Sequence, residues 1–474
     1  MSVSRAVGLL ALTFSIGASA QEGWPSSVFK ELRAAGLPGA SAAALVQEVD
    51  SPRYTLSVNH RTAMNPASVM KLVTALAALE LLGPAYRWKT EAYLDGTLTD
   101  GVLAGNLVLK GYGDPKLNQE SLWMLLRALR AKGLREIRGD LILDRGQFEP
   151  TQRDPGQFDG ETFRPYNVLP DALLVNFRSL RFSFFAEPEQ GSVRIDVDPR
   201  PPGLELINRL KVSQGPCPEG RAFRDLLKPA FDSGKQSASF SGQFPLSCGE
   251  RVINVALLEP NAHVSGVVRQ LWGEIGGSWT GSVRDGSVTP GARPFHVHES
   301  IALAEIVRDM NKYSNNVIAR QLFLTIGAEI GGPPARADQA ARAIRQWLEA
   351  RGVAATDLVM ENGSGLSRLE RSSAATLAAI LQLAWRSSVM PEFMASMPVA
   401  AVDGTMRRRL KNDGVAGNAH IKTGLLSDAR AMAGYVLDAR GRRHIVVMLV
   451  NHPSAHQSQA AFDALLRWVY DPKP

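Results

Sequence analysis

The chain has 474 residues, of which 45% are hydrophobic, 21% charged and 7% aromatic. This composition excludes a disordered or fibrous protein, and the length predicts two or three domains rather than a single core. The formal net charge of +7 is spread along the chain, with no basic run interleaved with aromatic residues, so no nucleic-acid partner is expected. A mild positive field of this kind favours an acidic polymer.

The N-terminus has the pattern of a secretory signal peptide. One basic residue, Arg5, precedes an apolar run from Ala6 to Gly17, and Ala18-Ser19-Ala20 matches the small-x-small cleavage pattern. We expect residues 1–20 to be removed, because the run is too short to span a bilayer. A retained N-terminal anchor is the alternative, since one arginine is a weak basic region for a signal peptide. We expect release into the periplasm or another extracytoplasmic space, with no transmembrane anchor in the mature chain and at most a loose membrane or wall association.

The chain contains two cysteines, Cys217 and Cys248. Export permits a disulfide between them, and two buried free thiols are the alternative. No cluster of histidines accompanies them, so no metal site is expected there. For the same reason His296-Val297-His298 is interpreted as part of a strand rather than as a metal site, and no cofactor is expected.

The first part of the mature chain predicts two strands followed by a helix. The strands cover Ala42 to Glu48 and Tyr54 to Asn59, with the turn Asp50-Ser51-Pro52 between them. The segment from Ser68 to Leu82 is almost wholly apolar. A helix this apolar is expected to be buried on nearly all sides.

From about Thr90 to Arg293, short alternating runs are broken by turn signals such as Asp95-Gly96 and Pro201-Pro202-Gly203, which predicts a β-rich region. Helical periodicity then returns, and a pair of strands follows it. The predicted helices are Ser300–Tyr313, Val317–Ile326, Arg336–Arg351, Ala374–Trp385 and Ala455–Tyr470, and the strands Ala431–Leu437 and His444–Val450 flank a turn.

Neither end of the chain has enough strands for a sheet of its own. The economical arrangement is a mixed sheet built from both ends and packed by helices, with the β-rich region inserted between them. The predicted domains are therefore 21–90 together with 292–474, and an insertion over 91–291 that forms two subdomains.

The first candidate for chemistry is Ser68-Val69-Met70-Lys71. Residues three apart on a helix share a face, so Lys71 can lie beside Ser68. A serine hydroxyl is a poor nucleophile until a base takes its proton, and Lys71 can act as that base if burial and nearby cations lower its pKa. Taken alone, however, the pattern is better explained by an N-cap serine followed by a lysine that reaches solvent.

Two further motifs follow in the chain. Tyr313-Ser314-Asn315-Asn316 lies between two predicted helices, where a hydroxyl can relay a proton and a carboxamide can hold a substrate amide. Lys422-Thr423-Gly424 lies on a short predicted strand, where lysine and threonine can bind a carboxylate and glycine allows close approach. Ordinary turn chemistry and a strand-end lysine are the respective alternatives.

The order S-x-x-K, S-x-N, K-T-G resembles the motif set of serine β-lactamases and penicillin-binding proteins. The long separation between Lys71 and Ser314 resembles one family in particular, the class C low-molecular-mass penicillin-binding proteins (serine peptidase family S13). Members of that family are D-alanyl-D-alanine carboxypeptidases and endopeptidases. Three more segments share the resemblance, which covers essentially the whole mature chain: Gly113-Asp114-Pro115, Asn362-Gly363-Ser364-Gly365-Leu366-Ser367 and Asp403-Gly404-Thr405.

The resemblance implies an α+β fold of the β-lactamase/transpeptidase type, in which helices cover an antiparallel sheet, with a large β-rich insertion. It implies a serine D,D-peptidase that cleaves D-Ala-D-Ala termini and D-alanyl cross-links of peptidoglycan through an acyl-enzyme. Peptidoglycan stem peptides would be the substrates, and β-lactam antibiotics would inhibit the enzyme by acylating its serine. The resemblance also allows a homodimer.

The same resemblance assigns a role to each motif residue. Ser68 would attack the carbonyl of the penultimate D-alanine, Lys71 would take its proton, and Ser314 would pass a proton to the leaving nitrogen. The backbone N–H groups of Ser68 and Leu425 would form the oxyanion hole. The substrate-binding residues would be Asn316 for the amide, Lys422 for positive charge, Thr423 for the terminal carboxylate, and Gly424.

Two positions depart from the family pattern. Many relatives carry a hydroxyl residue directly after K-T-G, where this chain has Leu425, so a second hydroxyl for the carboxylate is missing. In addition, Tyr313-Ser314-Asn315 fits the Y-x-N motif of class C β-lactamases, a register in which Tyr313 would carry the proton. A serine β-lactamase on the same scaffold is therefore the alternative function. Those lactamases lack a comparable insertion, which favours the S-x-N register.

Overall fold

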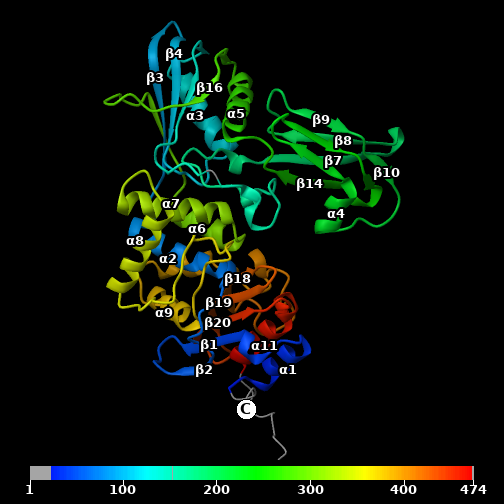
Figure 1. Cartoon of the computed structure of the whole chain (residues 1–474), viewed down its shortest axis with the longest axis vertical. Helices are drawn as coiled ribbons and strands as arrows, with labels where there is room; N and C mark the ends of the chain where they lie inside the picture. Colours follow the sequence, from blue (N-terminus) through cyan, green and yellow to red (C-terminus); the bar gives the residue numbers. More distant parts are fainter. Residues whose placement is uncertain (1–22, 152, 472–474) are drawn as a thin grey trace, which may run out of the picture.

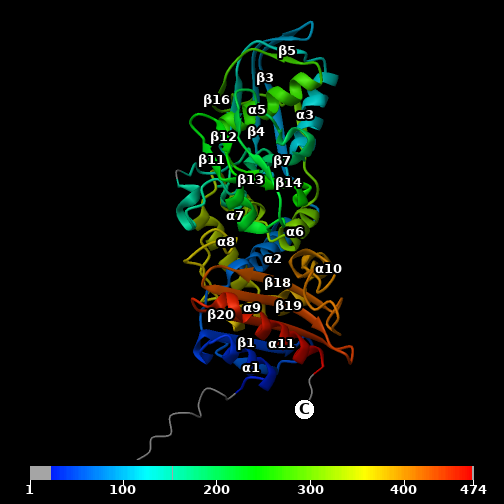
Figure 2. The same ribbon diagram turned by 90° about the vertical axis from the view of Figure 1, so that its right-hand side faces the viewer.

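The structure is a computed structural model that describes residues 23–151 and 153–471. The expected signal peptide, residues 1–20, lies outside the described residues. Figures 1 and 2 show an elongated molecule in which the first and last described segments lie together in the lower part. The middle of the chain forms the upper part, so the two ends of the sequence share one body.

The lower part is built on a five-stranded sheet with the order β18-β19-β20-β1-β2. Strands β1 (Ala42–Glu48) and β2 (Tyr54–Val58) come from the start of the chain, whereas β18 (Ala419–Leu425), β19 (Ala429–Leu437) and β20 (Arg443–Asn451) come from its end. Every neighbouring pair is antiparallel, so the expectation of a mixed sheet was wrong. The α+β fold class, an antiparallel sheet covered by helices, is confirmed.

Helices cover both faces of this sheet, because alternate strand side chains point to opposite faces and both sets are apolar. Leu45 and Tyr435 face one core, whereas Val46 and Val436 face the other. The first face is covered by α2 (Met70–Leu82), α6 (Leu303–Lys312), α7 (Asn316–Gly331), α8 (Ala337–Ala350), α9 (Ala374–Trp385) and the short α10 (Met390–Ser396). Helices α1 (Ser26–Ala34) and α11 (Gln459–Tyr470) cover the second face.

Helix α2 lies at the centre of the first core. Ten of its 13 residues are buried, as its apolar sequence predicts. Ser68 does not begin the α-helix itself but lies in a 3-10 turn, Ala67–Val69, directly before it. The helix is followed by Gly83, whose φ of +86° is in the region that favours glycine.

The upper part contains a seven-stranded sheet packed against two helices. The segment His296-Val297-His298 lies in its strand β17, which pairs with β3, so the strand interpretation is confirmed. The strands are β3 (Lys89–Thr99), β4 (Val102–Gly111), β5 (Glu136–Ile137), β6 (Leu141–Asp144), β15 (Ser278–Trp279), β16 (Val283–Asp285) and β17 (His296–Glu299), and the helices are α3 (Gln119–Ala131) and α5 (Pro260–Glu274).

A second lobe, at the right of Figure 1, is built from smaller sheets around a phenylalanine-rich core. A disulfide joins Cys217 to Cys248 with an S–S distance of 2.08 Å, which decides between the two alternatives for these cysteines. The lobe contains β7 (Leu180–Glu187), β8 (Ser192–Asp198), β9 (Glu205–Asn208), β10 (Lys211–Ser213), β11 (Pro229–Asp232), β12 (Ser237–Phe240), β13 (Gln243–Pro245), β14 (Glu250–Val255) and helix α4 (Gly220–Leu227).

The helices of this β-rich region are not predicted by its turn signals. Helix α3 does carry helical spacing, since Leu122, Leu125, Leu126 and Leu129 are all buried on one side. Helix α5 is harder to predict, because it contains two glycines that disfavour a helix. Gly266 is required by close packing, since a Cβ there would lie 2.2 Å from the Cβ of Pro201.

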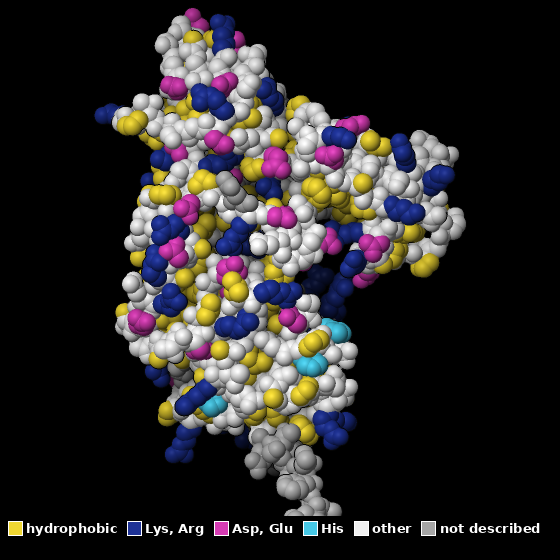
Figure 3. All heavy atoms as spheres, viewed as in Figure 1, with side chains coloured by type: hydrophobic (Ala, Val, Ile, Leu, Met, Phe, Trp, Pro, Cys, Tyr) yellow, Lys and Arg dark blue, Asp and Glu magenta, His cyan; other side chains and the backbone are white. Residues whose placement is uncertain are grey.

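Figure 3 shows that the surface is hollowed between the second lobe and the lower body. Helices α2 and α7 and strand β18 meet in the middle of the molecule, beneath the upper part (Figures 1 and 2). Within residues 23–151 and 153–471, no helix is both long and apolar enough to cross a bilayer.

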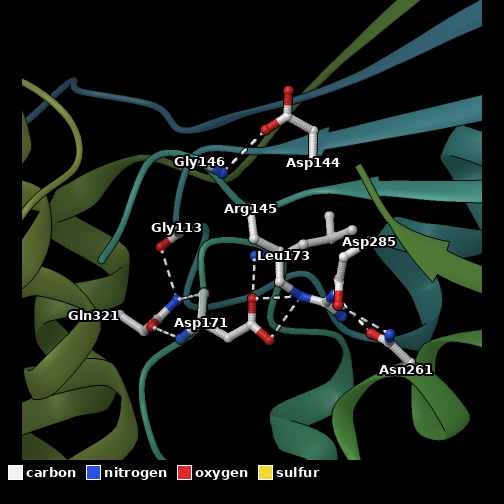
Figure 4. A network of polar contacts seen from close by, with 9 residues as sticks. All are labelled: Gly113, Asp144, Arg145, Gly146, Asp171, Leu173, Asn261, Asp285 and Gln321. Atoms are coloured by element: carbon white, nitrogen blue, oxygen red, sulfur yellow. Dashed lines mark hydrogen bonds and ion pairs between the residues drawn. The ribbon is translucent and has the colours of Figure 1, made fainter. Parts of the chain in front are cut away.

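A polar network connects the upper part to α7 (Figure 4). The side-chain amide of Gln321 on α7 donates to the carbonyls of Gly113 (3.1 Å) and Asp171 (2.9 Å), and its oxygen accepts from the backbone N–H of Asp171 (2.9 Å). The Asp171 carboxylate accepts from Arg145 Nε at 3.0 Å, and Arg145 also pairs with Asp285 on β16. The upper part is thereby tied to the helix that begins at Asn316.

We expect Arg145→Met to lower the free energy of unfolding by about 2 kcal/mol, because it leaves the half-buried Asp171 carboxylate without its cation. Denaturant unfolding of the purified chain measures this change. Arg53→Met is the matched control, since Arg53 is exposed and surface substitutions usually change stability by less than about 0.5 kcal/mol. Equal stability of the two variants would show that the network contributes nothing.

Candidate active site

The turn that carries Ser68 is fixed by Asn65. Its Oδ1 accepts from the N–H of Ala67 (2.8 Å), and its Nδ2 donates to the carbonyl of Ser367 (2.8 Å). Its backbone N–H donates to Asn451 Oδ1 at 2.7 Å. Ala67 has a φ of +45°, a strained conformation for a residue with a side chain. These hydrogen bonds hold the strained turn at the N-terminal end of α2.

Lys71 is fully buried one helical turn after Ser68. Its Nζ lies 3.0 Å from Ser68 Oγ and 2.7 Å from Asn316 Oδ1, and it also donates to the carbonyl of Ser364. The last two atoms can only accept hydrogen bonds. In a neutral amine the two N–H bonds therefore point at Asn316 and Ser364, and the lone pair faces Ser68 Oγ. This geometry is suited to removing the serine proton.

The surroundings also favour the neutral amine. Burial lowers the pKa of Lys71 well below its ordinary value, because the charged form loses its hydration. The nearby charge of Lys422 lowers this pKa further, and Arg320 on α7 adds to the effect. The carboxylate of Glu370 acts in the opposite direction. Burial and two neighbouring cationic groups thus favour the neutral form of Lys71 that a base requires.

The turn between α6 and α7 directs two side chains into this site. Ser314, with a φ of +55°, places its Oγ 2.8 Å from Lys422 Nζ. Asn315 caps α7 by accepting from the N–H of Ile318 at 3.0 Å, and Asn316 next to it reaches Lys71. Tyr313 is 72% exposed. Ser314, and not Tyr313, is thus the hydroxyl residue of this turn that contacts the buried Lys422.

Strand β18 brings the third motif against the first. It is an edge strand of the sheet, and Lys422 on it is fully buried and also donates to the carbonyl of Thr423 (2.7 Å). Burial lowers the pKa of Lys422 to about 7. A Cβ on Gly424 would lie 2.9 Å from the backbone nitrogen of Ser68. Glycine is therefore needed at this position for the close approach of β18 to the nucleophile turn.

The residues singled out from the sequence therefore meet in one place. Ser68, Lys71 and Asn316 form one hydrogen-bonded set, and Ser314 and Lys422 form a second set beside it. Thr423 Oγ1 lies 2.9 Å from Thr405 Oγ1, which connects it to the Asp403-Gly404-Thr405 segment. The side chain of Leu425 is 57% exposed.

Glu370 is a further residue of the site that its sequence pattern does not reveal. This carboxylate is completely buried beside the 361–365 loop, from which Ser364 contacts Lys71. No motif signals it, because it stands in an ordinary polar stretch of the sequence. The segment 362–367 carries the family resemblance, which assigns it no role of its own.

The upper part also contributes to the site's surroundings. A cavity of about 770 Å³ adjoins the 361–369 segment and is lined from both parts of the molecule. Phe158 from the upper part lies 4.6 Å from the Arg368 guanidinium and packs in a small cluster that includes Ala67. The lining of this cavity is rich in charged groups, among them Arg153, Arg320 and Arg368.

Comparisons with known proteins agree on one family. A sequence profile of the D-Ala-D-Ala carboxypeptidase 3 (S13) family matches residues 27–470. The D-alanyl-D-alanine carboxypeptidase DacB of Haemophilus influenzae is 25% identical over 456 residues, covering 95% of this chain and 93% of the relative. The D-alanyl-D-alanine carboxypeptidase of an Actinomadura strain is 28% identical over 420 residues, covering 85% of this chain and 77% of the relative.

Solved structures agree with this fold. Penicillin binding protein 4 of Haemophilus influenzae superposes with a TM-score of 0.76 at 23% identity, covering 93% of this chain and 99% of that one. The same protein in complex with a β-lactam superposes with a TM-score of 0.72 at 22% identity, with the same coverage of both chains. These similarities establish the fold of the chain.

We expect Gly424→Ala to slow the reaction of Ser68 with a labelled penicillin by about 100-fold, because the new methyl group would displace the nucleophile turn. Gly273→Ala is the matched control, since a Cβ there meets nothing within 4 Å. Stopped-flow or gel-based labelling measures both rates. Similar rates for the two variants would show that the close approach of β18 is not required.

Proposed function

The chain belongs to the D-Ala-D-Ala carboxypeptidase 3 (S13) family, and from this membership we propose that it is a serine D,D-peptidase of peptidoglycan. It would cleave D-Ala-D-Ala termini and D-alanyl cross-links through an acyl-enzyme on Ser68. The observation that carries the proposal is the buried Lys71 amine 3.0 Å from Ser68 Oγ. Its N–H bonds point at Asn316 Oδ1 and at the Ser364 carbonyl, two atoms that can only accept hydrogen bonds. β-Lactams would acylate the same serine and inhibit the enzyme.

In the first step Lys71 takes the proton of Ser68, and Oγ forms a bond to the carbonyl carbon of the penultimate D-alanine. The carbonyl oxygen becomes an oxyanion, which the backbone N–H groups of Ser68 and Leu425 would stabilise. The closeness of β18 to the Ser68 amide supports this pair of donors. An exposed Leu425 side chain is compatible with it, because only the backbone takes part.

In the second step the C–N bond breaks. Ser314 gives its hydroxyl proton to the leaving nitrogen and takes up the proton that Lys71 removed from Ser68, so that Lys71 is neutral again. Lys422, 2.8 Å from Ser314 Oγ, orients this hydroxyl. Asn316 would hold the substrate amide through its Nδ2, since its Oδ1 already contacts Lys71. Thr423 and the charge of Lys422 would bind the terminal carboxylate. Water then hydrolyses the ester, with Lys71 again as the base.

The division of the chain into domains is part of this proposal. Residues 21–90 and 292–474 would form the catalytic domain, and residues 91–291 would be inserted into it as two subdomains. The separate sheets and cores of the upper part support this division. The pairing of β17 with β3 favours placing residues up to Glu299 with the insertion.

We also propose that the enzyme works in the periplasm or another extracytoplasmic space, where its peptidoglycan substrate lies. The disulfide between Cys217 and Cys248 supports this location, because disulfides persist in oxidising compartments. A homodimer is the proposed assembly, and it rests on the family resemblance alone.

The decisive experiment incubates the mature protein with labelled penicillin and maps the adduct by peptide mass spectrometry. We expect the label on the Ser68 peptide and its loss in Ser68→Ala. Release of D-alanine from monomeric and from cross-linked muropeptides then measures the two peptidase activities. Labelling elsewhere, or no loss in Ser68→Ala, would contradict the proposal, and fast turnover of penicillin without a stable adduct would indicate a β-lactamase.

We expect Ser314→Ala to reduce kcat for D-alanine release by about 100-fold, because the leaving nitrogen loses its proton donor. Tyr313→Phe removes the neighbouring exposed hydroxyl and should leave kcat within about twofold of the wild-type value. The comparison of these two variants decides the register of the motif. A large loss of kcat in Tyr313→Phe with little change of kcat in Ser314→Ala would show that Tyr313 is the proton donor.

A further inference from the structure

Glu370 is a buried carboxylate with an unusual set of partners. Its side chain is 0% exposed, and within residues 23–151 and 153–471 no cationic side chain lies within ion-pair distance of it. Its Oε1 accepts from the backbone N–H groups of Glu361 (3.2 Å), Asn362 (3.0 Å) and Gly363 (2.8 Å). Its Oε2 accepts from the N–H of Gly365 at 2.8 Å. One side chain thus gathers four N–H groups of a single short loop.

That loop, residues 361–365, contacts the catalytic helix and the nucleophile turn. The carbonyl of Ser364 accepts from Lys71 Nζ, and the carbonyl of Gly363 accepts from Thr74 Oγ1 at 2.7 Å. Gly365, with a φ of +78°, approaches so closely that a Cβ on it would lie 1.9 Å from the carbonyl oxygen of Ala67. The position of the loop therefore sets the position of the acceptor that directs the Lys71 amine.

Only an ionised carboxylate satisfies this arrangement. It has acceptor sites on both oxygens and no hydrogen to direct at an N–H group. A glutamine would present its own NH₂ to at least one of the four donors. Burial raises the pKa of Glu370, whereas the four backbone N–H groups oppose that change by stabilising the charge. A buried carboxylate without a salt bridge is costly, which calls for a reason beyond packing.

We propose that Glu370 is a positioning residue for the reaction at Ser68, in which it fixes the 361–365 loop so that the Ser364 carbonyl aims the Lys71 amine at Ser68 Oγ. The inference deepens the proposed function and rests on it. Glu370 does not touch substrate. It acts through two links, the loop backbone and the lysine, both of which are present in the structure.

The charge of Glu370 has a second consequence. Three charged groups face Lys71: Lys422 from β18 and Arg320 from α7 lower its pKa, and Glu370 is the one that raises it. Removal of the negative charge therefore lowers the pKa of Lys71 further. A larger fraction of the lysine is then neutral at low pH. The acid limb of the pH profile, where the acylation rate falls as the pH falls, therefore moves to lower pH. A purely structural role of Glu370 would produce no such movement.

The test compares two variants of the full mature chain. Glu370→Gln removes the charge and keeps the length of the side chain, whereas Glu370→Asp keeps the charge and shortens the reach to the loop. We expect both to lower the maximal rate of Ser68 acylation by labelled penicillin, by about 10- to 100-fold. Only Glu370→Gln should move the acid limb to lower pH. Glu349→Gln, at an exposed position on α8, is the charge-matched control and should behave as the wild type.

Several outcomes would overturn the inference. A wild-type rate in Glu370→Gln would do so, and so would a slower rate with an unchanged acid limb, which would indicate a structural support alone. Thermal unfolding identifies a variant that fails to fold. If Glu370→Gln fails to fold, a wild-type acylation rate in Glu370→Asp would still overturn the inference. If the proposed function is wrong, the wild type itself carries no penicillin label on Ser68. That result distinguishes failure of the proposed function from failure of the inference about Glu370.

Discussion

The site depends on the burial of the Lys71 amine beside a serine. A lysine in such a place loses the hydration of its charged form, and this loss lowers its pKa and favours the neutral amine. Burial alone would leave the amine free to rotate away from Ser68. The acceptors Asn316 Oδ1 and the Ser364 carbonyl remove that freedom, since each takes one N–H bond. Desolvation and orientation are thus supplied by different parts of the chain.

These parts are distant in the sequence and come together because of the sheet and its helices. The apolar helix α2 supplies the desolvation, and α7 begins at the residue that contacts Lys71. Helix α7 is also where the upper part attaches, through Gln321 and the Asp171–Arg145 pair. The upper part therefore supports the site from outside, since the helix that it contacts carries Asn316 at its first turn.

The sequence allowed the strands of the central sheet to be predicted, because they are short apolar runs with clear turns. It did not predict that every neighbouring pair is antiparallel. It also predicted that the three motifs S-x-x-K, S-x-N and K-T-G form one site, because their order along the chain resembles that of a known family. It did not allow Glu370 to be found, since that residue interacts with backbone N–H groups whose positions depend on the folded loop. The helices α3 and α5 were missed for another reason: turn signals and glycines locally outweighed the leucine spacing.

Two buried lysines share this site, and their surroundings assign them different tasks. The charge of Lys422 lowers the pKa of Lys71, whereas desolvation is the cause that lowers the pKa of Lys422, to about 7. Lys422 donates hydrogen bonds to Ser314 Oγ and to the carbonyl of Thr423. In its ammonium form it has a third N–H bond, which can bind a carboxylate. The contacts thus differ between the two lysines: Lys71 lies against Ser68 Oγ, whereas Lys422 lies against Ser314 Oγ.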